Sequence, residues 1–502
     1  MNKGLKALKY NTFSTLLLEI VTLITGLIMP RLILSYFGSA SNGLVSSITQ
    51  FLGFSTILRA GIGGAIRAAL YGPIARNSTE EIDAIMSATD RHMKKIAVII
   101  ATAILVFACI YPFFVLDEYS WFYAFTMVLV IGSGTFVENL FGIKCQILLQ
   151  ADQKYYIVTL SSVVSHILVT LTSAMIMVCG ADMHAVKIGA VIAAFIKPLI
   201  LNLYVKKKYI INWKSEPNEK AIAQRWNAFF QQVATIVNEN VPLVILTVLQ
   251  PLTSVSVYTV HSMIVFNIRA IVNSFSAGSN STYGAMLASG EHSELKKTFF
   301  YTEWLVFAVG CVLYSITAVM LTPFILLYTE SIVDVNYNQP AFGILMVISV
   351  FVLSIKAPYQ YLAEAAGKFK ETRNGAVLEV IVNIFVSVLC VIKFGFIGVI
   401  IGGLVAYTIR TADYAIFTFK NILKHSLLHI LKHTVMAIVS FTACFFVGKA
   451  VSVLDCTNYF EWIINACLVA LSSFIIVFVV SLLFYKNELF AFLNGIKGKV
   501  KR

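Results

Sequence analysis

Apolar runs long enough to cross a lipid bilayer recur along the whole chain, and this feature restricts the fold more than any other. A helix needs about 20 apolar residues to span the hydrocarbon core. In lipid, the backbone groups of such runs must be hydrogen-bonded within the segment, which favours helices. Hydrophobic residues make up 58% of the 502 residues and charged residues only 13%, so no long polar segment remains for a separate aqueous domain. The sequence predicts an all-α polytopic membrane protein.

Hydropathy divides the chain into about fourteen transmembrane helices. By residue number, the predicted spans are 12–36, 43–67, 95–116, 120–143, 156–179, 185–205, 227–249, 254–279, 299–327, 340–364, 374–394, 396–418, 433–453 and 459–485. The turns between them are short, and we expect no large outer loop.

The charges of the connecting loops alternate along the chain. One set of loops, together with both ends of the chain, carries 29 Lys and Arg residues, whereas the other set holds Lys187, Lys393 and Lys449. Cytoplasmic loops are enriched in Lys and Arg, so both termini are predicted to be cytoplasmic. The formal charge of +13 does not indicate nucleic-acid binding, because that function requires cations gathered on one face.

The chain also repeats itself weakly. Three pairs of features recur at offsets of 212 to 215 residues, namely Pro30 with Pro242, residues 151–154 with residues 366–369, and Lys197 with Arg410. Each repeat holds six spans, an even number, so both copies point the same way across the membrane. Such parallel repeats are related by a pseudo-two-fold axis along the membrane normal.

This repeat predicts the domain organisation. Residues 1–211 would form an N-terminal lobe of helices 1–6, and residues 212–425 a C-terminal lobe of helices 7–12. Residues 426–502 would add two helices and a basic cytoplasmic tail. A transport cavity is expected between the two lobes.

Short motifs resemble a known family. The segment from Pro30 to Gly38, followed by Asn42-Gly43-Leu44, resembles the first hairpin of Wzx-type polysaccharide flippases, and the loop from Gln150 to Lys154 is similar to theirs. The resemblance implies membership of the superfamily that also holds MATE drug exporters and the lipid II flippase MurJ. It implies alternating-access transport of undecaprenyl-pyrophosphate-linked oligosaccharide from the cytoplasmic to the outer leaflet of a bacterial inner membrane, for cell-surface polysaccharide assembly.

Ionisable groups at membrane depth usually face a cavity or a partner. Of the cations predicted there, five are candidates for binding substrate in the cavity: Arg31, Arg59, Arg269, Lys197 and Lys356. Arg59 and Arg269 fall near mid-bilayer on corresponding spans, and paired guanidinium groups bind pyrophosphate oxygens well. The resemblance points the same way, because MurJ uses cavity arginines from these spans. The alternatives are structural pairing with carboxylates and, for Arg31, snorkelling to the interface.

Four buried acids are candidates for binding a coupling H⁺ or Na⁺: Glu19, Glu138, Glu239 and Glu379. Structural ion pairing is an equally good interpretation of each. Glu239 is the most suggestive, because Pro242 frees backbone carbonyls nearby. Arg410 and Asp413 share a helical face at i,i+3 spacing and are predicted to form a structural ion pair.

Two further patterns occur in segments that are predicted to lie on the cytoplasmic side. The residues from Ser78 to Glu81 resemble a capping box, and residues 79–94 are predicted to form an amphipathic helix on the inner membrane surface. His425, His429 and His433 recur at i,i+4 spacing. They are interpreted as a solvated or lipid-facing stripe, with a metal ladder as the alternative. The eight cysteines form no CxxC pair, so no metal site is expected.

Three function classes compete. The leading one is a flippase with a polyprenyl-pyrophosphate-linked glycan and membrane lipids as partners, and with neither a cofactor nor a catalytic residue. A cation-coupled MATE-type exporter is the nearest rival, although its cavity should be acidic or aromatic. A membrane glycosyltransferase or polymerase would need catalytic acids on a sizeable outer loop, which the predicted spans leave no room for.

Overall fold

The computed structural model describes residues 3–59, 62–213, 215–216, 229–277 and 279–500. Within these ranges the chain is almost entirely helical and contains no strand. By its contacts it divides into two compact units, Met1–Ser256 and Val257–Arg502, and each is described separately. The prediction of an all-α polytopic fold is confirmed.

The fourteen predicted crossings are found once two very long apolar segments are divided. Twelve candidate spans occur in the described residues, but Phe13–Arg59 holds 47 residues and Phe369–Leu423 holds 55. At about 1.5 Å per residue, either is more than twice as long as the hydrocarbon core is thick. The first kinks at Gly38 (φ 79°, ψ 179°) inside helix α1, and the second breaks at Gly395 (φ 64°). Each therefore provides two crossings.

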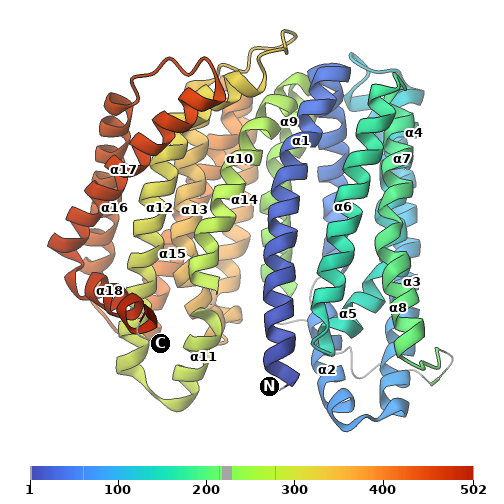
Figure 1. The fold of residues 1–502 in the computed structure, drawn as a ribbon, viewed down its shortest axis with the longest axis horizontal. Helices are drawn as coiled ribbons and strands as arrows, with labels where there is room; N and C mark the ends of the chain where they lie inside the picture. The colour runs from blue at the N-terminus through green and yellow to red at the C-terminus, as the bar shows by residue number, and fades with distance from the viewer. Residues whose placement is uncertain (1–2, 60–61, 214, 217–228, 278, 501–502) are drawn as a thin grey trace. The chain divides into compact units, whose positions relative to one another are not determined.

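Figure 1 supports the division of α1 (Lys3–Gly53) at its kink. The N-terminal end of α1 and the later helix α2 (Ile62–Arg76) lie at the same end of the first unit (Figure 1), so the chain reverses direction between them. Glycine suits the kink because a positive φ is unfavourable for residues with a Cβ atom.

The first unit continues from α1 through a series of helices and short irregular turns. They are η1 (Phe54–Arg59), α2, α3 (Thr79–Ile110), η2 (Tyr111–Phe114), α4 (Trp121–Val137), η3 (Glu138–Gly142), α5 (Ile143–Ala151), α6 (Tyr155–Val178), α7 (Met183–Ala194), α8 (Ile196–Lys208) and α9 (Phe229–Leu249). Helix α10 (Leu252–Ala277) begins in this unit and continues in the second.

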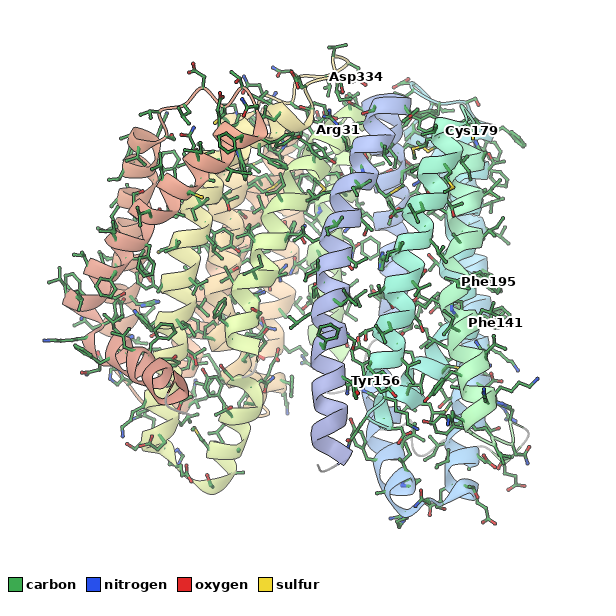
Figure 2. All side chains as sticks on the ribbon, viewed as in Figure 1. Arg31, Phe141, Tyr156, Cys179, Phe195 and Asp334 are labelled. Carbon is green, nitrogen blue, oxygen red and sulfur yellow. The ribbon has the colours of Figure 1, made fainter. Side chains whose placement is uncertain are left out.

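Helix α1 is held against α6 at the end where both begin. The Asn11 amide donates to the carbonyl oxygen of Gln153 at 3.1 Å, and its own oxygen accepts from the backbone N–H of Tyr156 at 2.8 Å. Figure 2 shows Tyr156 at this end of α6, and its ring lies 5.8 Å from that of Tyr10. In the same turn the Lys154 ammonium contacts Asp152 and Tyr209; burial lowers its pKa, but these hydrogen bonds outweigh burial and raise it.

The second unit is built in the same way. It holds the rest of α10, α11 (Ser279–Ser289), α12 (His292–Tyr328), α13 (Pro340–Ala365), α14 (Phe369–Phe394), η5 (Gly395–Ile397), α15 (Gly398–Thr418), η6 (Phe419–Leu423), α16 (Leu428–Val451), α17 (Tyr459–Phe484) and α18 (Lys486–Val500).

Two kinds of contact hold these helices together. Helices α14 and α15 approach closely at Gly398 and Gly402, a small-xxx-small spacing that lets backbones meet in the absence of a hydrophobic driving force. The last helix to cross, α17, is tied to α12 by hydrogen bonds: the Trp304 indole donates to Ser481 and the Trp462 indole donates to the carbonyl of Met320, both at 3.0 Å.

The contact-based units and the predicted lobes are different divisions. Helix α9 packs on α1 and therefore belongs to the first unit by contacts, although the repeat assigns it to the second lobe. The lobes at 1–211 and 212–425, with the appended segment 426–502, come from the repeat and stay a prediction.

The amphipathic helix predicted for residues 79–94 is not a separate surface helix. These residues form the first turns of the continuous α3, and Met86 and Met93 are buried. The same face is bonded to protein, since Asp90 accepts from Lys144 at 2.5 Å and Ser87 donates to the carbonyl of Trp213 at 3.1 Å. Packing against neighbouring helices, rather than lipid, explains the apolar stripe. Ser78 occupies the N-cap position, but its side chain makes no capping bond.

Candidate functional site

Arg59 lies at the end of the 3₁₀ turn η1, inside the second crossing of the first unit. Its side chain is partly buried, and it makes no ion pair or hydrogen bond with the residues that the structure describes. The nearest opposing charge is Glu138, which is close enough for the two to interact electrostatically. Glu138 is already engaged, because its Oε1 accepts a hydrogen bond from Lys197 Nζ at 2.9 Å.

The residues of the Glu138–Lys197 pair both lie where a helix loses its regular form. Glu138 is the first residue of the π-helix η3, which joins α4 to α5. Lys197 is the second residue of α8, two residues after the break at Phe195 and directly before Pro198. Figure 2 shows Phe195 beside Phe141 of η3, and the two ring centroids lie 6.1 Å apart.

Polar contacts stabilise this irregular backbone. The Asn202 amide donates to the carbonyl oxygen of Phe141 at 2.8 Å and to that of Pro198 at 2.7 Å. Backbone groups released by a helix irregularity are costly in lipid unless something bonds them. The bond to Phe141 joins the π-helix η3 to α8, so the two irregularities form one seam, whereas the bond to Pro198 lies within α8.

A cavity of about 360 Å³ opens beside the pair. Helices α4, α6, α7 and α8 line it, and its polar side chains include Glu138, Lys197, His166 and two serines, Ser162 and Ser165. His166 interacts electrostatically with both members of the pair. Lys197, Glu138 and His166 thus line one cavity of the first unit, and Arg59 lies close enough to Glu138 to interact with it electrostatically.

The second unit contains a denser charge cluster on α13, α14 and α15. Lys356 Nζ donates to Glu379 Oε1 at 3.1 Å, and Arg410 Nε lies 3.5 Å from the other oxygen of Glu379. Arg410 also donates to Asp413 at 2.6 Å, which is the ion pair that the i,i+3 spacing predicts. Its guanidinium lies over the Tyr414 ring, 3.9 Å from the centroid.

The centre of this second cluster is buried, whereas Asp413 at its edge is 45% exposed. The side chains of Arg410 and Glu379 are 0% and 6% exposed. A Cβ atom at Gly375 of α14 would lie 2.1 Å from both Arg410 Nη1 and Asp413 Oδ2, so the absence of a side chain there makes room for the pair. Arg269 of α10 lies near enough to Lys356 to repel it electrostatically.

The two clusters occupy corresponding helices of the predicted repeat. Lys197 and His166 precede Arg410 and Glu379 by 213 residues each. Glu138 lies on the fourth crossing, whereas the matching tenth crossing carries Lys356. The predicted site residues do not include His166, although the offset of 213 residues that relates Lys197 to Arg410 also relates His166 to Glu379.

The other predicted residues lie elsewhere in their units. Arg31 is partly buried in α1, on the part of the helix that leads to the Gly38 kink (Figure 2). Glu19 is exposed on α1, and Glu239 is exposed on α9, where its backbone carbonyl accepts from the Gln50 amide at 3.0 Å. A role in ion coupling stays a prediction for these acids, as cavity binding does for the five cations.

The prediction of a solvated or lipid-facing histidine stripe is wrong for two of its three members. His429 Nε2 lies 2.8 Å from a carboxylate oxygen of Glu303, and the Tyr359 hydroxyl donates to the other oxygen. His433 is buried and hydrogen-bonded to the Tyr485 hydroxyl at 2.9 Å. Spacing along α16 could not reveal these partners, because they belong to α12, α13 and the α17–α18 junction. No group suited to a metal ion occurs in the described part of the chain.

Comparison with known proteins finds solved structures that have the same architecture. No family model matches the chain, and no curated protein matches it. Among solved structures, the lipid II flippase MurJ in an inward closed conformation aligns with a TM-score of 0.70 at 16% identity, covering 95% of this chain and 99% of MurJ.

MATE transporters align as well. An inward-facing multidrug resistance MATE transporter gives a TM-score of 0.63 at 14% identity and covers 82% of this chain and 96% of that protein. A point mutant of the Vibrio cholerae MATE transporter VcmN gives 0.53 at 15% identity, with coverages of 85% and 99%. At these identities the likeness establishes the fold, so the chain has the polytopic membrane fold shared by MurJ and the MATE transporters.

Proposed function

We propose that this chain is a lipid-linked oligosaccharide flippase of the superfamily that contains MurJ and the MATE transporters. It moves a polyprenyl-pyrophosphate-linked glycan across a bacterial cytoplasmic membrane by alternating access, and it is a transporter rather than an enzyme. Its termini lie in the cytoplasm, as the loop charges predict. The shared fold supports a transporter of this kind, and the charged side chains within the spans support an anionic cargo.

One observation carries the choice of cargo: Arg59 lacks an ion pair or hydrogen bond within the described chain. An arginine at the centre of a bilayer costs at least about 3 kcal/mol unless water or an anion compensates it. The carboxylate nearest to Arg59 is shared with Lys197. An arginine so placed is suited to an anion supplied from outside the protein.

Pyrophosphate fits this chemistry better than a cationic drug. A guanidinium group forms paired, charge-assisted hydrogen bonds with phosphate oxygens. The same headgroup is the main obstacle to spontaneous flipping, because moving charged groups through hydrocarbon is prohibitive. Arg59, Arg31 and Lys197 of the first unit would neutralise it while the polyprenyl tail stays in lipid. For the second unit, Arg269 and Lys356 stay predictions, and Lys356 is already paired with Glu379.

The MATE-type exporter remains the rival, with a different cavity chemistry. A cation-coupled drug exporter needs acidic groups free to exchange cargo with H⁺ or Na⁺. The buried Glu379 is held by Lys356 and Arg410, and Glu303 by His429 and Tyr359. These partners favour the flippase, and they leave its coupling ion, H⁺ or Na⁺, as a separate question.

The proposal is tested by replacing Arg59. In cells that depend on this chain for surface polysaccharide, Arg59→Ala should trap lipid-linked glycan in the inner leaflet and abolish export. Arg76→Ala is the matched control, because Arg76 forms an exposed ion pair with Glu81 at 2.9 Å at the inner end of α2. Normal polysaccharide in a folded, membrane-inserted Arg59→Ala protein would reject the anion site.

A further inference from the structure

We propose that Glu138 is a built-in counter-anion that holds Lys197 while the carrier is empty and is displaced when the pyrophosphate of the substrate arrives. Lys197 then becomes a second phosphate ligand beside Arg59, at the seam formed by η3 and α8. This inference rests on the proposed function. It adds that Glu138 competes with the pyrophosphate headgroup for Lys197 and so lowers the affinity of the protein for that headgroup.

The charge balance of the first unit makes Glu138 the natural competitor. One carboxylate faces two permanent cations, Lys197 from α8 and Arg59 from η1, and the imidazole of His166 from α6. Two cations sharing one anion have an unmet demand for negative charge. A diphosphate group can satisfy both cations, whereas Glu138 can satisfy them only in part.

Accessibility separates this pair from a purely structural one. The Glu138 and Lys197 side chains are 44% and 21% exposed, and both line the 360 Å³ cavity. Ion pairs that water can reach contribute little net stability. The hydrogen bond from Asn202 to Phe141 holds η3 and α8 together independently of the pair, so Lys197 can change partner without separating the helices.

The helical irregularities support a binding role for the same place. π-Helices are rare and are often found at functional sites, and non-helical backbone at membrane depth is tolerated where it borders a cavity. Here the π-helix begins at Glu138, and the helix break at Phe195 lies two residues before Lys197. The charged residue at each irregularity thus lines the same cavity.

The alternative is a static ion pair that fastens α4 to α8. The two interpretations predict opposite effects of Glu138→Gln on ligand affinity. If Glu138 competes with substrate, neutralising it releases Lys197 and tightens binding. If the pair only fastens helices, the substitution loosens the unit and leaves affinity unchanged or weaker.

The measurement is the affinity of the full-length protein in lipid nanodiscs for geranylgeranyl pyrophosphate, with geranylgeraniol as the uncharged probe. Glu138→Gln should bind the pyrophosphate about two- to fivefold more tightly, the range that a partly exposed ion pair supports. The gain should shrink at high salt, and geranylgeraniol binding should not change. Glu138→Asp, which keeps the charge, should retain most of the wild-type affinity.

The matched control is Glu81→Gln, which removes an exposed ion pair of the same 2.9 Å length with Arg76 and should leave affinity unchanged. Combining Glu138→Gln with Lys197→Met should cancel the gain, because the released ammonium is then absent. Unchanged or weaker pyrophosphate binding by a folded Glu138→Gln protein, with Arg59→Ala still abolishing it, would overturn the counter-anion role alone. If Arg59→Ala binds normally, the proposed function itself fails.

Discussion

Arg410 illustrates how a charged residue becomes stable within a membrane span. It is fully buried, yet its guanidinium group has three partners: the Tyr414 ring covers one face, and the Asp413 and Glu379 carboxylates lie near Nη1 and Nε. The Asp413 contact was predictable because it is local in sequence. The contacts with Glu379 and Lys356 were not, because they join three helices whose relative rotation a hydropathy pattern does not determine.

Replacing Arg410 should strongly destabilise the second unit. Arg410→Met removes a buried cation and leaves Glu379 with Lys356 alone, and breaking a buried ion pair in this way costs about 3 to 5 kcal/mol. Thermal unfolding of the purified protein in detergent measures the loss. Lys297→Met is the control, because its ion pair with Glu294 is exposed and should contribute less than about 1 kcal/mol. Equal stability of the two variants would contradict a structural role for the buried cluster.

At the scale of helices, the sequence predicts most where a pattern runs over many consecutive residues of one helix. The apolar runs identified the crossings, and Gly38 and Gly395 mark the points where two merged segments must be divided. The stripe in residues 79–94 and the histidines of α16 misled for the same reason. An amphipathic face shows that a helix has a preferred side but does not say whether protein, lipid or water covers it.

The sequence predicts which charged residues belong to the candidate site, but it does not predict which of them pair with one another. Lys197 and Glu138 were both identified as ionisable groups at membrane depth, yet their contact depends on the π-helix at Glu138 and the break before Lys197. A π-helix has no reliable sequence signature, so the register that brings the two side chains together had to come from the structure.

Close packing of α14 on α15 provides a prediction with an adjacent control. A Cβ atom at Gly402 would lie 2.0 Å from Ser387 Oγ and 2.6 Å from its backbone nitrogen. Gly402→Ala must therefore push the helices apart, at a cost of about 1 to 3 kcal/mol. At Gly403 the nearest atom would be 3.5 Å away, on Tyr407. Gly403→Ala should be neutral or stabilising by up to about 1 kcal/mol.

Thermal unfolding of the two glycine variants side by side tests this packing. Their compositions are identical and their positions adjacent, so a difference in melting temperature reports the α14–α15 contact itself. A Gly402→Ala protein as stable as Gly403→Ala would show that these helices are not in such close contact.

For the whole molecule, the sequence predicts the orientation in the membrane from the charges of all the loops together, not from any single segment. The number of crossings follows from hydropathy and kinks within the chain, but which end faces the cytoplasm follows from the excess of Lys and Arg in alternate loops. In the first unit, Cys179 lies at the end opposite α2 (Figures 1 and 2). The loop charges predict that Cys179 faces outward and that the turn between α2 and α3 faces the cytoplasm.

Labelling of single cysteines tests this orientation directly. Cys179 is exposed and directly precedes Gly180, which turns the chain with φ 75°. With the other seven cysteines replaced, it should react with a membrane-impermeant maleimide in intact cells. A Glu80→Cys variant without native cysteines places an exposed thiol at the start of α3, and it should react only after the membrane is made permeable. The reverse pattern would invert the topology, and with it the inward-to-outward direction proposed for the glycan, while leaving the fold intact.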